Sequence, residues 1–511
     1  MPQAATRAAA PARICAGVNP ASPTPPRGFR RPAPLLLAGL GAVLLVFLTQ
    51  HNGFFWDGIL LVSRYGQFYY DTGFHTFFVP DDIAVSYPGT LAWGVALGWR
   101  AFGKTLEVSQ WLMLPWLLLL IWQAWLLVRR FVPAAHAGIG LALLLLDPTL
   151  LGQAALVAHD ILLVALFLTA LNAQLHHRRG VLALALVGLT LLHLRGTFLV
   201  GALGLLEGLS WWLLDRHGAD SPPGTAFSAP ERLGAALRRL LPAYVPVGLV
   251  TVGWLLLFQA RYGWVFYRAT GPWAVHTADL GALGVARNIG LVGWRLLDLG
   301  RIALWATTLS VVFRIWRRRQ WTTTSTRLTL FVLVPLGVLM ASMVRFPVDI
   351  GHRYYLPVFL LTALWVAHHV TQLATPPVRR RVLGLCLISL LSGHFWVYPD
   401  GIAKGWDASL AHLPYFRLRR EMLTELARRR IPLAAVGSDY PNAYPLRFPD
   451  LGTDNRAFAP LDLPQNQYVL ESNVMNGFTN AQLAELRNPA RWRLLHEARS
   501  AQVYLRLYER W

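Results

Sequence analysis

Ionisable side chains lie beside long apolar runs at several places in this sequence. These are Asp57 after Phe54-Phe55-Trp56, Asp160 after His159, Arg195 after His193, and His352-Arg353 before Tyr354-Tyr355-Leu356-Pro357. A charged group at the centre of a bilayer costs at least about 2.5 kcal/mol, so a charge near a membrane span is a candidate functional residue. Carboxylates can accept a proton from a reacting hydroxyl, and arginines can hold a phosphate in their fork of N–H donors.

Each of these residues also has a structural explanation. Asp57 could mark the membrane interface beside an aromatic belt, and Asp160 could be the N-cap of a helix. His352-Arg353 could be an anchor that extends to the membrane surface. A functional site is favoured because acids and bases from separate turns would lie on one face of the membrane.

The composition indicates a membrane protein. Of 511 residues, 55% are hydrophobic and 14% are charged, and the mean hydropathy is +0.40. Soluble domains carry about 25% charged residues. The net charge of +21 comes from arginines in short clusters between apolar runs, which is typical of loops beside an anionic leaflet and argues against a nucleic-acid partner. Cys15 and Cys386 support neither a disulfide framework nor a zinc site.

Apolar runs predict about 11 transmembrane helices, because a span needs about 20 mainly apolar residues. The predicted spans are 34–50, 110–128, 134–150, 160–176, 180–194, 196–214, 242–259, 290–315, 327–345, 355–373 and 382–398. A further apolar stretch at 88–103 could cross the membrane or lie at its surface.

The arginines decide between these two topologies. The N-terminal tail contains five arginines, which places it in the cytoplasm. If 88–103 does not cross, the later arginine clusters fall on the same side, whereas a crossing would move all of them outside. These clusters are Arg129-Arg130, Arg178-Arg179, residues 215–241, Arg317 to Arg319 and Arg379 to Arg381. We therefore predict a cytoplasmic N-terminus and an extracytoplasmic C-terminus.

This topology predicts a division of the chain. Residues 1–33 form a disordered basic cytoplasmic tail, and 34–398 form the transmembrane domain, with a long first outer loop at 51–109. The polar residues 399–511 form a small extracytoplasmic α/β domain. In it we expect a helix near 416–429, strands at 432–437 and 467–471, a helix near 479–488, and a hairpin from 492–498 and 501–508.

The order of motifs resembles the GT-C glycosyltransferases of the protein mannosyltransferase and aminoarabinose transferase type. The matching positions are Asp57, Tyr87-Pro88-Gly89, Ala101-Phe102-Gly103, Leu146-Asp147-Pro148, His159-Asp160-Ile161-Leu162 and Arg353-Tyr354-Tyr355-Leu356-Pro357. The resemblance covers roughly 34–373. Two positions depart from the pattern: Gly58 follows Asp57 where the family often has a second acid, and Ser86-Tyr87-Pro88-Gly89 lacks the usual basic residue.

The resemblance implies a GT-C-like fold and transfer of a sugar from a polyprenyl-phosphate donor to a lipid, glycan or protein acceptor at the outer face of a bacterial inner membrane. It implies two catalytic residues, Asp57 as general base and Asp160 to orient the acceptor or assist. Donor phosphate binding would come from Arg353 and Arg195, with Arg64, His352 and Tyr87 as further candidates. No cofactor is required, although Asp57 and Asp160 could hold a divalent metal.

Two other functions are compatible with the sequence. A transporter or lipid flippase would have charges near the bilayer midplane and broken helices, and Arg295, Asp298 and Arg301 within 290–315 are candidates. A non-catalytic GT-C-like subunit would have Asp57 and Asp160 far apart.

Overall fold

The computed structural model describes residues 32–214, 229–265, 280–347, 350–399, 407–439, 442, 444–474 and 477–511. Nearly all of the predicted tail at 1–33 lies outside these ranges, as do residues 215–228 of the predicted loop at 215–241. The rest of that prediction is wrong, because residues 229–241 form the start of helix α11 (Ala229–Tyr262).

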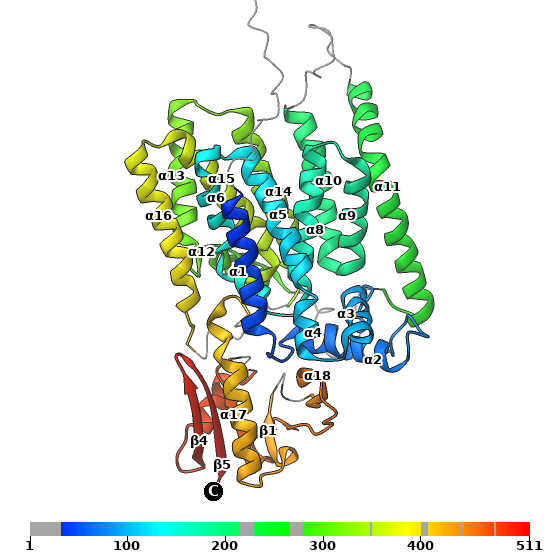
Figure 1. The fold of residues 1–511 in the computed structure, drawn as a ribbon, viewed down its shortest axis with the longest axis vertical. Helices are drawn as coiled ribbons and strands as arrows, with labels where there is room; N and C mark the ends of the chain where they lie inside the picture. Colours follow the sequence, from blue (N-terminus) through cyan, green and yellow to red (C-terminus); the bar gives the residue numbers. More distant parts are fainter. Residues whose placement is uncertain are drawn as a thin grey trace, which may run out of the picture.

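Most of the chain forms a bundle of apolar helices that lie side by side (Figure 1). Their buried faces form one continuous hydrophobic core. The bundle consists of α1 (Ala33–Thr49), α5 (Leu114–Phe131), α6 (Ala137–Leu145), α8 (His159–Leu175), α9 (Arg179–Leu192), α10 (Leu194–Leu214), α11 (Ala229–Tyr262), α13 (Ile302–Arg318), α14 (Thr323–Met343), α15 (Leu356–Leu373) and α16 (Pro376–Ser392).

Several of these helices are long and apolar enough to cross a bilayer, which makes the chain an integral membrane protein. By length and composition there are five such helices among the described residues, or up to seven if each of two bent pairs is one span. Helices α1, α8 and α9 are also apolar but shorter, with 10–17 residues. The predicted count of about 11 spans stays a prediction.

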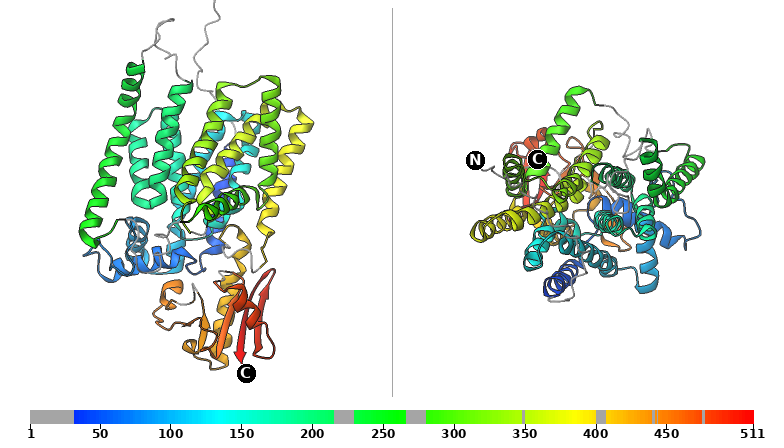
Figure 2. Two further views of the ribbon diagram at one scale, coloured as in Figure 1. Left: turned by 180° about the vertical axis from the view of Figure 1, so that it is seen from behind. Right: turned by 90° about the horizontal axis from the view of Figure 1, so that it is seen from above.

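The prediction of one continuous span at 290–315 is wrong. The segment forms α12 (Ala282–Leu297) and α13, which meet at a bend of 94°. Leu299 and Gly300 both adopt positive φ at this break, and a side chain on Gly300 would collide with the carbonyl of Ser389. Because α13 runs along the bundle, α12 lies across it (Figure 2).

The predicted span at 134–150 is also broken. Helix α6, which follows the 3₁₀ turn η2 (Ala134–His136), is bent by 67° from α7 (Pro148–Ala154). The break falls at Asp147-Pro148, where the proline disfavours helical backbone in the residue before it. Asp147 instead caps α7 by accepting from the backbone N–H groups of Thr149 and Leu150.

The segment between α1 and α5 folds across one end of the bundle. It contains the π-helical turn η1 (Ile59–Arg64), α2 (Tyr65–Asp71), α3 (Thr90–Phe102) and α4 (Leu106–Trp111). Helix α3 has 13 residues, about 20 Å of helix, which is shorter than the roughly 30 Å of a hydrocarbon core. In Figure 1 these blue helices lie between the bundle and the C-terminal region.

The C-terminal region contains a five-stranded sheet in the order β2-β1-β3-β5-β4. Strand β1 is parallel to β2 and β3, while β5 is antiparallel to β3 and β4. The elements are α17 (Pro414–Arg428), β1 (Val436–Ser438), α18 (Arg447–Asp450), β2 (Ala459–Pro460), β3 (Tyr468–Ser472), α19 (Asn480–Leu486), β4 (Trp492–Ser500) and β5 (Val503–Arg510), with short 3₁₀ turns η5 (Gly393–Phe395), η6 (Leu410–His412) and η7 (Leu433–Ala435) before β1.

The predicted C-terminal helices, the strand at 467–471 and the hairpin are confirmed. The strand expected at 432–437 begins only at Val436, because Leu433–Ala435 forms a 3₁₀ turn after Pro432. Turn residues at the start of this segment outweigh its apolar pattern.

The C-terminal region docks on the η1–α2 segment through backbone groups of α18. The N–H of Phe54 donates to the carbonyl of Pro449 at 2.8 Å, and Ser63 Oγ donates to the carbonyl of Phe448 at 2.6 Å. Phe55 stacks on His412 with ring centroids 5.0 Å apart. Asp57 is therefore held between the bundle and the C-terminal region.

Candidate functional site

Arg353 is the centre of the candidate site. It lies in the turn η4 (His352–Tyr355), directly before α15, and its side chain is only 7% exposed. Its Nη2 donates to Oδ2 of Asp57, and its Nη1 donates to Oδ2 of Asp407 at 2.7 Å. One guanidinium thus joins the segment after α1 to the segment before α17.

A second buried ion pair lies beside the first. Nη1 of Arg195 donates to Oδ1 of Asp160 at 2.6 Å, and both side chains are at most 10% exposed. The ring of Tyr354 connects the two pairs, because its centroid lies 4.5 Å from the guanidinium carbon of Arg195 and 5.5 Å from that of Arg353. We call these five charged residues the Arg353 cluster: Asp57, Asp160, Arg195, Arg353 and Asp407.

Local backbone structure explains where the Asp160–Arg195 pair lies. Asp160 is in the first turn of α8, where a carboxylate interacts favourably with the helix dipole. The N-cap is Ala158, so the interpretation of Asp160 as an N-cap is wrong. Arg195 opens α10 after the extended residue His193, and a side chain on Gly196 would collide with the backbone of Leu189. Glycine therefore permits the tight α9–α10 turn that presents Arg195.

The interpretation of His352-Arg353 as a surface anchor is also wrong, since both side chains are buried and paired. His352 Nε2 lies 2.6 Å from Oδ2 of Asp298, which also accepts a hydrogen bond from the hydroxyl of Tyr398. His352 therefore belongs to a neighbouring network at the α12–α13 break, one residue from the Arg353 cluster.

Asp57 is the member of the Arg353 cluster that solvent reaches most, with 29% of its side chain exposed. Burial of the carboxylate raises its pKa, against the opposing effect of the Arg353 charge; the Asp407 carboxylate raises it further. The Asp57 carboxylate therefore binds a proton more readily than an ordinary aspartate does.

A small pocket adjoins the Arg353 cluster. Its polar wall consists of Asp160, Arg195, Arg353 and Tyr354. Its apolar wall consists of Leu163, Val164, Leu199, Leu339 and Pro357. The pocket thus places two guanidinium groups at the edge of an apolar surface.

Tyr87 lies in an aromatic group next to the Asp160–Arg195 pair. Its ring stacks on His193 with centroids 4.3 Å apart and meets His159 edge-on at 5.9 Å. The structure thus brings Tyr87 beside the turns that carry Asp160 and Arg195.

The structure does not bring Arg64 to the Arg353 cluster. Arg64 Nη2 donates to Oδ2 of Asp82 at 2.6 Å, and the Asp82 side chain is 66% exposed. Its guanidinium also lies 5.9 Å from the ring centroid of Phe448, against the C-terminal region.

Sequence reasoning missed Asp407. The segment that carries it packs against α7: Gln153 Nε2 donates to the Asp407 carboxylate at 3.1 Å, and a side chain on Gly152 would collide with the Asp407 backbone. One sequence feature could have indicated it, because Trp406-Asp407 repeats the Trp56-Asp57 dipeptide shortly after an apolar run.

A buried pair between Asp147 and Arg301 was also missed. Arg301 is 1% exposed and donates to both carboxylate oxygens of Asp147, at 2.7 and 2.8 Å, and to Thr149 Oγ1 at 2.6 Å. Its guanidinium stacks over Phe359 at 3.8 Å. The pair joins the α6–α7 and α12–α13 breaks. Within the described residues, no group of three or more His, Cys, Asp or Glu side chains is arranged to hold a metal ion.

Comparison with known proteins establishes the fold. The crystal structure of ArnT from Cupriavidus metallidurans bound to undecaprenyl phosphate superposes with a TM-score of 0.55, at 14% identity, over 93% of this chain and 97% of that one. The apo structure of the same protein gives a TM-score of 0.53 at 13% identity, with the same coverage. No family model and no curated protein sequence matches this chain. The predicted resemblance to the aminoarabinose transferase type is confirmed at the level of the fold.

Proposed function

We propose that this chain, which has the fold of ArnT, is a membrane glycosyltransferase that moves a sugar from a polyprenyl-phosphate donor to an acceptor hydroxyl. The neighbouring ArnT structure holds undecaprenyl phosphate, which supports a lipid-phosphate donor of that kind. The observation that carries the proposal is the pocket in which Arg195 and Arg353 meet five apolar side chains. A polyprenyl phosphate has the same two parts, an anionic head and an apolar chain.

The Arg353 cluster offers the groups that the reaction needs. Guanidinium donors suit phosphate oxygens, and they stabilise the negative charge that the phosphate gains as the sugar leaves. A carboxylate within reach of the acceptor hydroxyl can remove its proton. We assign phosphate binding to Arg195 and Arg353, the general base to Asp57, and orientation of the acceptor and of Arg195 to Asp160.

The ion pairs suggest how the base is controlled. Arg353 donates to Asp57 and Asp407, so a donor phosphate has to compete with these carboxylates for the guanidinium. Loss of the Arg353 contact raises the basicity of Asp57 as the donor arrives. The acceptor oxygen then bonds to the anomeric carbon, its proton passes to Asp57, and the electron pair of the broken glycosidic bond leaves with the phosphate.

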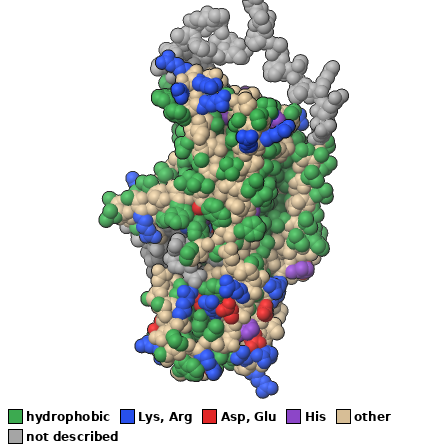
Figure 3. Space-filling view, turned by 90° about the vertical axis from the view of Figure 1, so that its left-hand side faces the viewer, with side chains coloured by type: hydrophobic (Ala, Val, Ile, Leu, Met, Phe, Trp, Pro, Cys, Tyr) green, Lys and Arg blue, Asp and Glu red, His purple; other side chains and the backbone are tan. Residues whose placement is uncertain are grey.

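We place the site on the outer face of a bacterial inner membrane. Figure 3 shows Lys and Arg at the end of the bundle away from the sheet, where α5 ends with Arg129-Arg130 and α13 ends with Arg317-Arg318. It also shows them on the C-terminal region, where Asp and Glu lie among them. Basic loops favour the cytoplasm, so the Arg353 cluster and the C-terminal region 399–511 would face outward.

The bent helix pairs are the feature that a transporter would share. Arg301 and Asp298, however, bond to Asp147 at the start of α7 and to His352 before α15. These contacts place the charges at helix ends near the Arg353 cluster. The glycosyltransferase proposal therefore accounts for them better than a midplane transport site does.

The test is to incubate the purified full-length protein with a panel of radiolabelled polyprenyl-phosphate sugars and an acceptor extract from the membrane. We expect transfer from at least one donor, and Asp57→Asn should lower it by about 10²–10⁴-fold. Asp82→Asn is the matched control, since Asp82 is an exposed acid of the same loop. If no donor supports transfer, the chain is a non-catalytic subunit; full activity of Asp57→Asn would remove Asp57 from the mechanism.

A further inference from the structure

Three rings lie together beside the Asp160–Arg195 pair, those of Tyr87, His159 and His193. The Tyr87 and His193 rings stack with centroids 4.3 Å apart. The His159 ring meets both edge-on, with its centroid 5.9 Å from that of Tyr87 and 5.7 Å from that of His193. We call these three residues the ring trio. The proposed transfer reaction uses neither histidine, although both lie within two residues of Asp160 or Arg195.

Tyr87 is also a point at which the sequence departs from the GT-C pattern. The segment Ser86-Tyr87-Pro88-Gly89 lacks the usual basic residue, and the structure places two imidazole rings against Tyr87. Thr90 Oγ1 donates to the carbonyl of Leu191 at 2.9 Å, which joins the start of α3 to the end of α9. This contact holds Tyr87 close to the turn that carries His193.

The backbone fixes the hydrogen-bonding state of His193. Its Nδ1 accepts from the backbone N–H of Arg195 at 3.0 Å, so this nitrogen carries no hydrogen. An imidazole in that state is uncharged and has its hydrogen on Nε2. His193 is only partly buried, and it therefore offers a ligand an Nε2–H donor.

His159 has a buried polar atom that the described part of the chain does not satisfy. The residue is 4% exposed, and its Nε2 has no hydrogen-bond partner among the described residues. An unpaired polar atom in a protein interior is unfavourable, so a ligand group that pairs with Nε2 gains binding energy.

A hydroxyl group suits these two nitrogens because it both donates and accepts. It can accept from His193 Nε2–H, and it can donate to His159 Nε2 or accept from it, whichever tautomer His159 adopts. Two hydrogen bonds through one oxygen atom span roughly 5.6 Å, and the two ring centroids lie 5.7 Å apart.

Helix geometry separates the ring trio from the apolar wall of the pocket beside the Arg353 cluster. Leu163 and Val164 line that wall, and they share the face of α8 that carries Asp160. His159 comes one residue earlier and therefore points about 100° away around the helix. If Arg195 holds the donor phosphate and the prenyl chain follows the apolar wall, the ring trio lies on the side left for the sugar.

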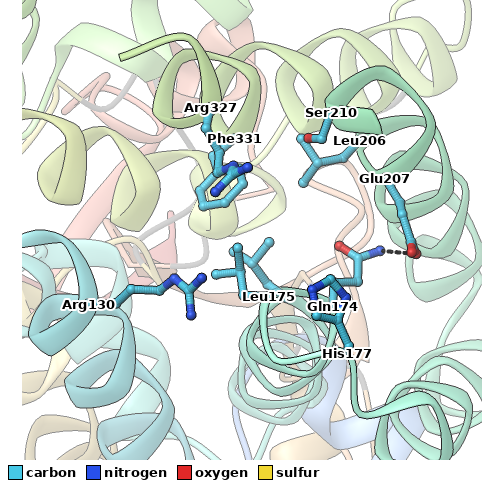
Figure 4. Close-up of a pocket in the computed structure, with 10 residues that line it drawn as sticks. Arg130, Gln174, Leu175, His177, Leu206, Glu207, Ser210, Arg327 and Phe331 are labelled. Atoms are coloured by element: carbon cyan, nitrogen blue, oxygen red, sulfur yellow. Dashed lines mark hydrogen bonds between the residues drawn. The ribbon is translucent and has the colours of Figure 1, made fainter. Parts of the chain in front are cut away.

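A larger pocket elsewhere in the bundle is too remote to hold this sugar. Arg130, Gln174 and Arg327 are among its lining residues, and Gln174 Nε2 donates to Glu207 Oε2 at 3.4 Å (Figure 4). Arg130 lies in the last turn of α5, whose end we place in the cytoplasm. None of the lining residues of this pocket belongs to the Arg353 cluster or to the ring trio.

We propose that the ring trio is the subsite for the donor sugar, in which His193 Nε2–H and His159 Nε2 bind a hydroxyl group of the sugar ring. This inference rests on the proposed function, since it needs a sugar linked to a polyprenyl phosphate. It assigns the recognition of the sugar to uncharged imidazoles and leaves the phosphate to the two arginines.

The experiment compares the carrier with and without a sugar. Thermal stability of the full-length protein is measured in neutral detergent with undecaprenyl phosphate, or with the same lipid carrying glucose, galactose, mannose or arabinose. A ligand that binds only the folded state raises Tm in a concentration-dependent way. For the wild type, at least one sugar-bearing lipid should give the same rise at about 10-fold lower concentration than undecaprenyl phosphate.

Two variants remove the hydroxyl contacts in different ways. His193→Asn keeps an oxygen that can accept from the N–H of Arg195 but has no group in place of Nε2–H. His159→Phe keeps a ring against Tyr87 but has no nitrogen. In both variants the advantage of the sugar-bearing lipid should disappear, while the response to undecaprenyl phosphate stays as in the wild type. His75→Phe is the matched control, because His75 is exposed.

The outcomes separate this inference from the proposed function. A sugar advantage that survives in both variants would overturn the inference alone, and it would be expected if a water molecule bridged the two histidines. An equal loss in His75→Phe, a weaker response of both variants to undecaprenyl phosphate, or no sugar advantage in the wild type would also overturn it. If undecaprenyl phosphate itself does not stabilise the wild type, the proposed function fails, and the inference fails with it.

Discussion

Asp57 and Asp407 lie far apart in the sequence and accept hydrogen bonds from the same guanidinium, that of Arg353. Asp57 follows the first apolar helix, α1, and Asp407 follows the last, α16. The Arg353 side chain therefore joins two segments from opposite ends of the sequence to the turn before α15. Each carboxylate changes the charge that the other experiences, and this coupling leads to the first prediction.

Asp407→Asn should shift the pH dependence of transfer. Asp57 must be ionised to act as a base, and its raised pKa places the acidic limb of kcat/KM above the range of an ordinary aspartate. The Asp407 charge raises this pKa, so removing it moves the acidic limb to lower pH. The measurement is kcat/KM against pH for wild type, Asp407→Asn and the control Asp450→Asn; a limb that stays in place would show that Asp57 does not govern it.

The same raised pKa affects folding. Asp57 has a higher pKa folded than unfolded, so the folded state binds more protons between the two values and the free energy of unfolding falls as pH rises through that window. Asp57→Asn should therefore not lower Tm at neutral pH. A marked drop in the Tm of Asp57→Asn would contradict this prediction. A loss of activity in this variant would then reflect unfolding and would not test the role of Asp57 as a base.

Arg353→Met should destabilise the fold strongly. It leaves Asp57 and Asp407 without their shared cation in a buried setting, which typically costs about 3–5 kcal/mol. Arg64→Met is the matched control, because its pair with Asp82 is exposed and worth about 0–1 kcal/mol. Thermal unfolding in detergent compares the two variants, and equal losses would contradict a structural role for the Arg353 contacts.

Arg195→Lys should raise KM for the donor. Lysine keeps the charge but loses the planar fork and the stacking of the guanidinium on Tyr354. Loss of one charge-assisted hydrogen bond is worth about 1.5–3 kcal/mol, or about 10–100-fold in KM. Steady-state kinetics with varied donor would detect this, with Arg64→Lys as the control. A change in kcat alone would instead assign Arg195 to the chemical step.

The Asp147–Arg301 pair should behave as one unit. Arg301→Met leaves Asp147 buried and uncompensated, and we expect a loss of about 3–5 kcal/mol. Asp147→Asn/Arg301→Met should cost less than the sum of the two single variants, because neither charge remains. Thermal unfolding of the four proteins in the cycle provides the test, and simple additivity would argue against the pair.

The sequence by itself determined the membrane class, the resemblance to GT-C enzymes and most candidate residues. Span length and arginine clustering are local properties, and they also identified 88–103 as a segment that need not cross the membrane. Asp57, Asp160, Arg195 and Arg353 could be selected because a charge beside an apolar run is costly wherever the chain folds.

Only the tertiary structure decided which charges meet. Arg353 meets Asp407 because the segment that carries Asp407 packs closely on Gly152. Arg64 is an arginine like Arg353 and lies in the same predicted loop as Asp57. Its side chain nevertheless donates to Asp82 and not to Asp57. The break at Asp298 likewise depends on contacts between distant residues, such as the close approach of Gly300 to the carbonyl of Ser389, which hydropathy does not encode. Long-range pairing is set by packing, and packing is not a property of any local stretch of sequence.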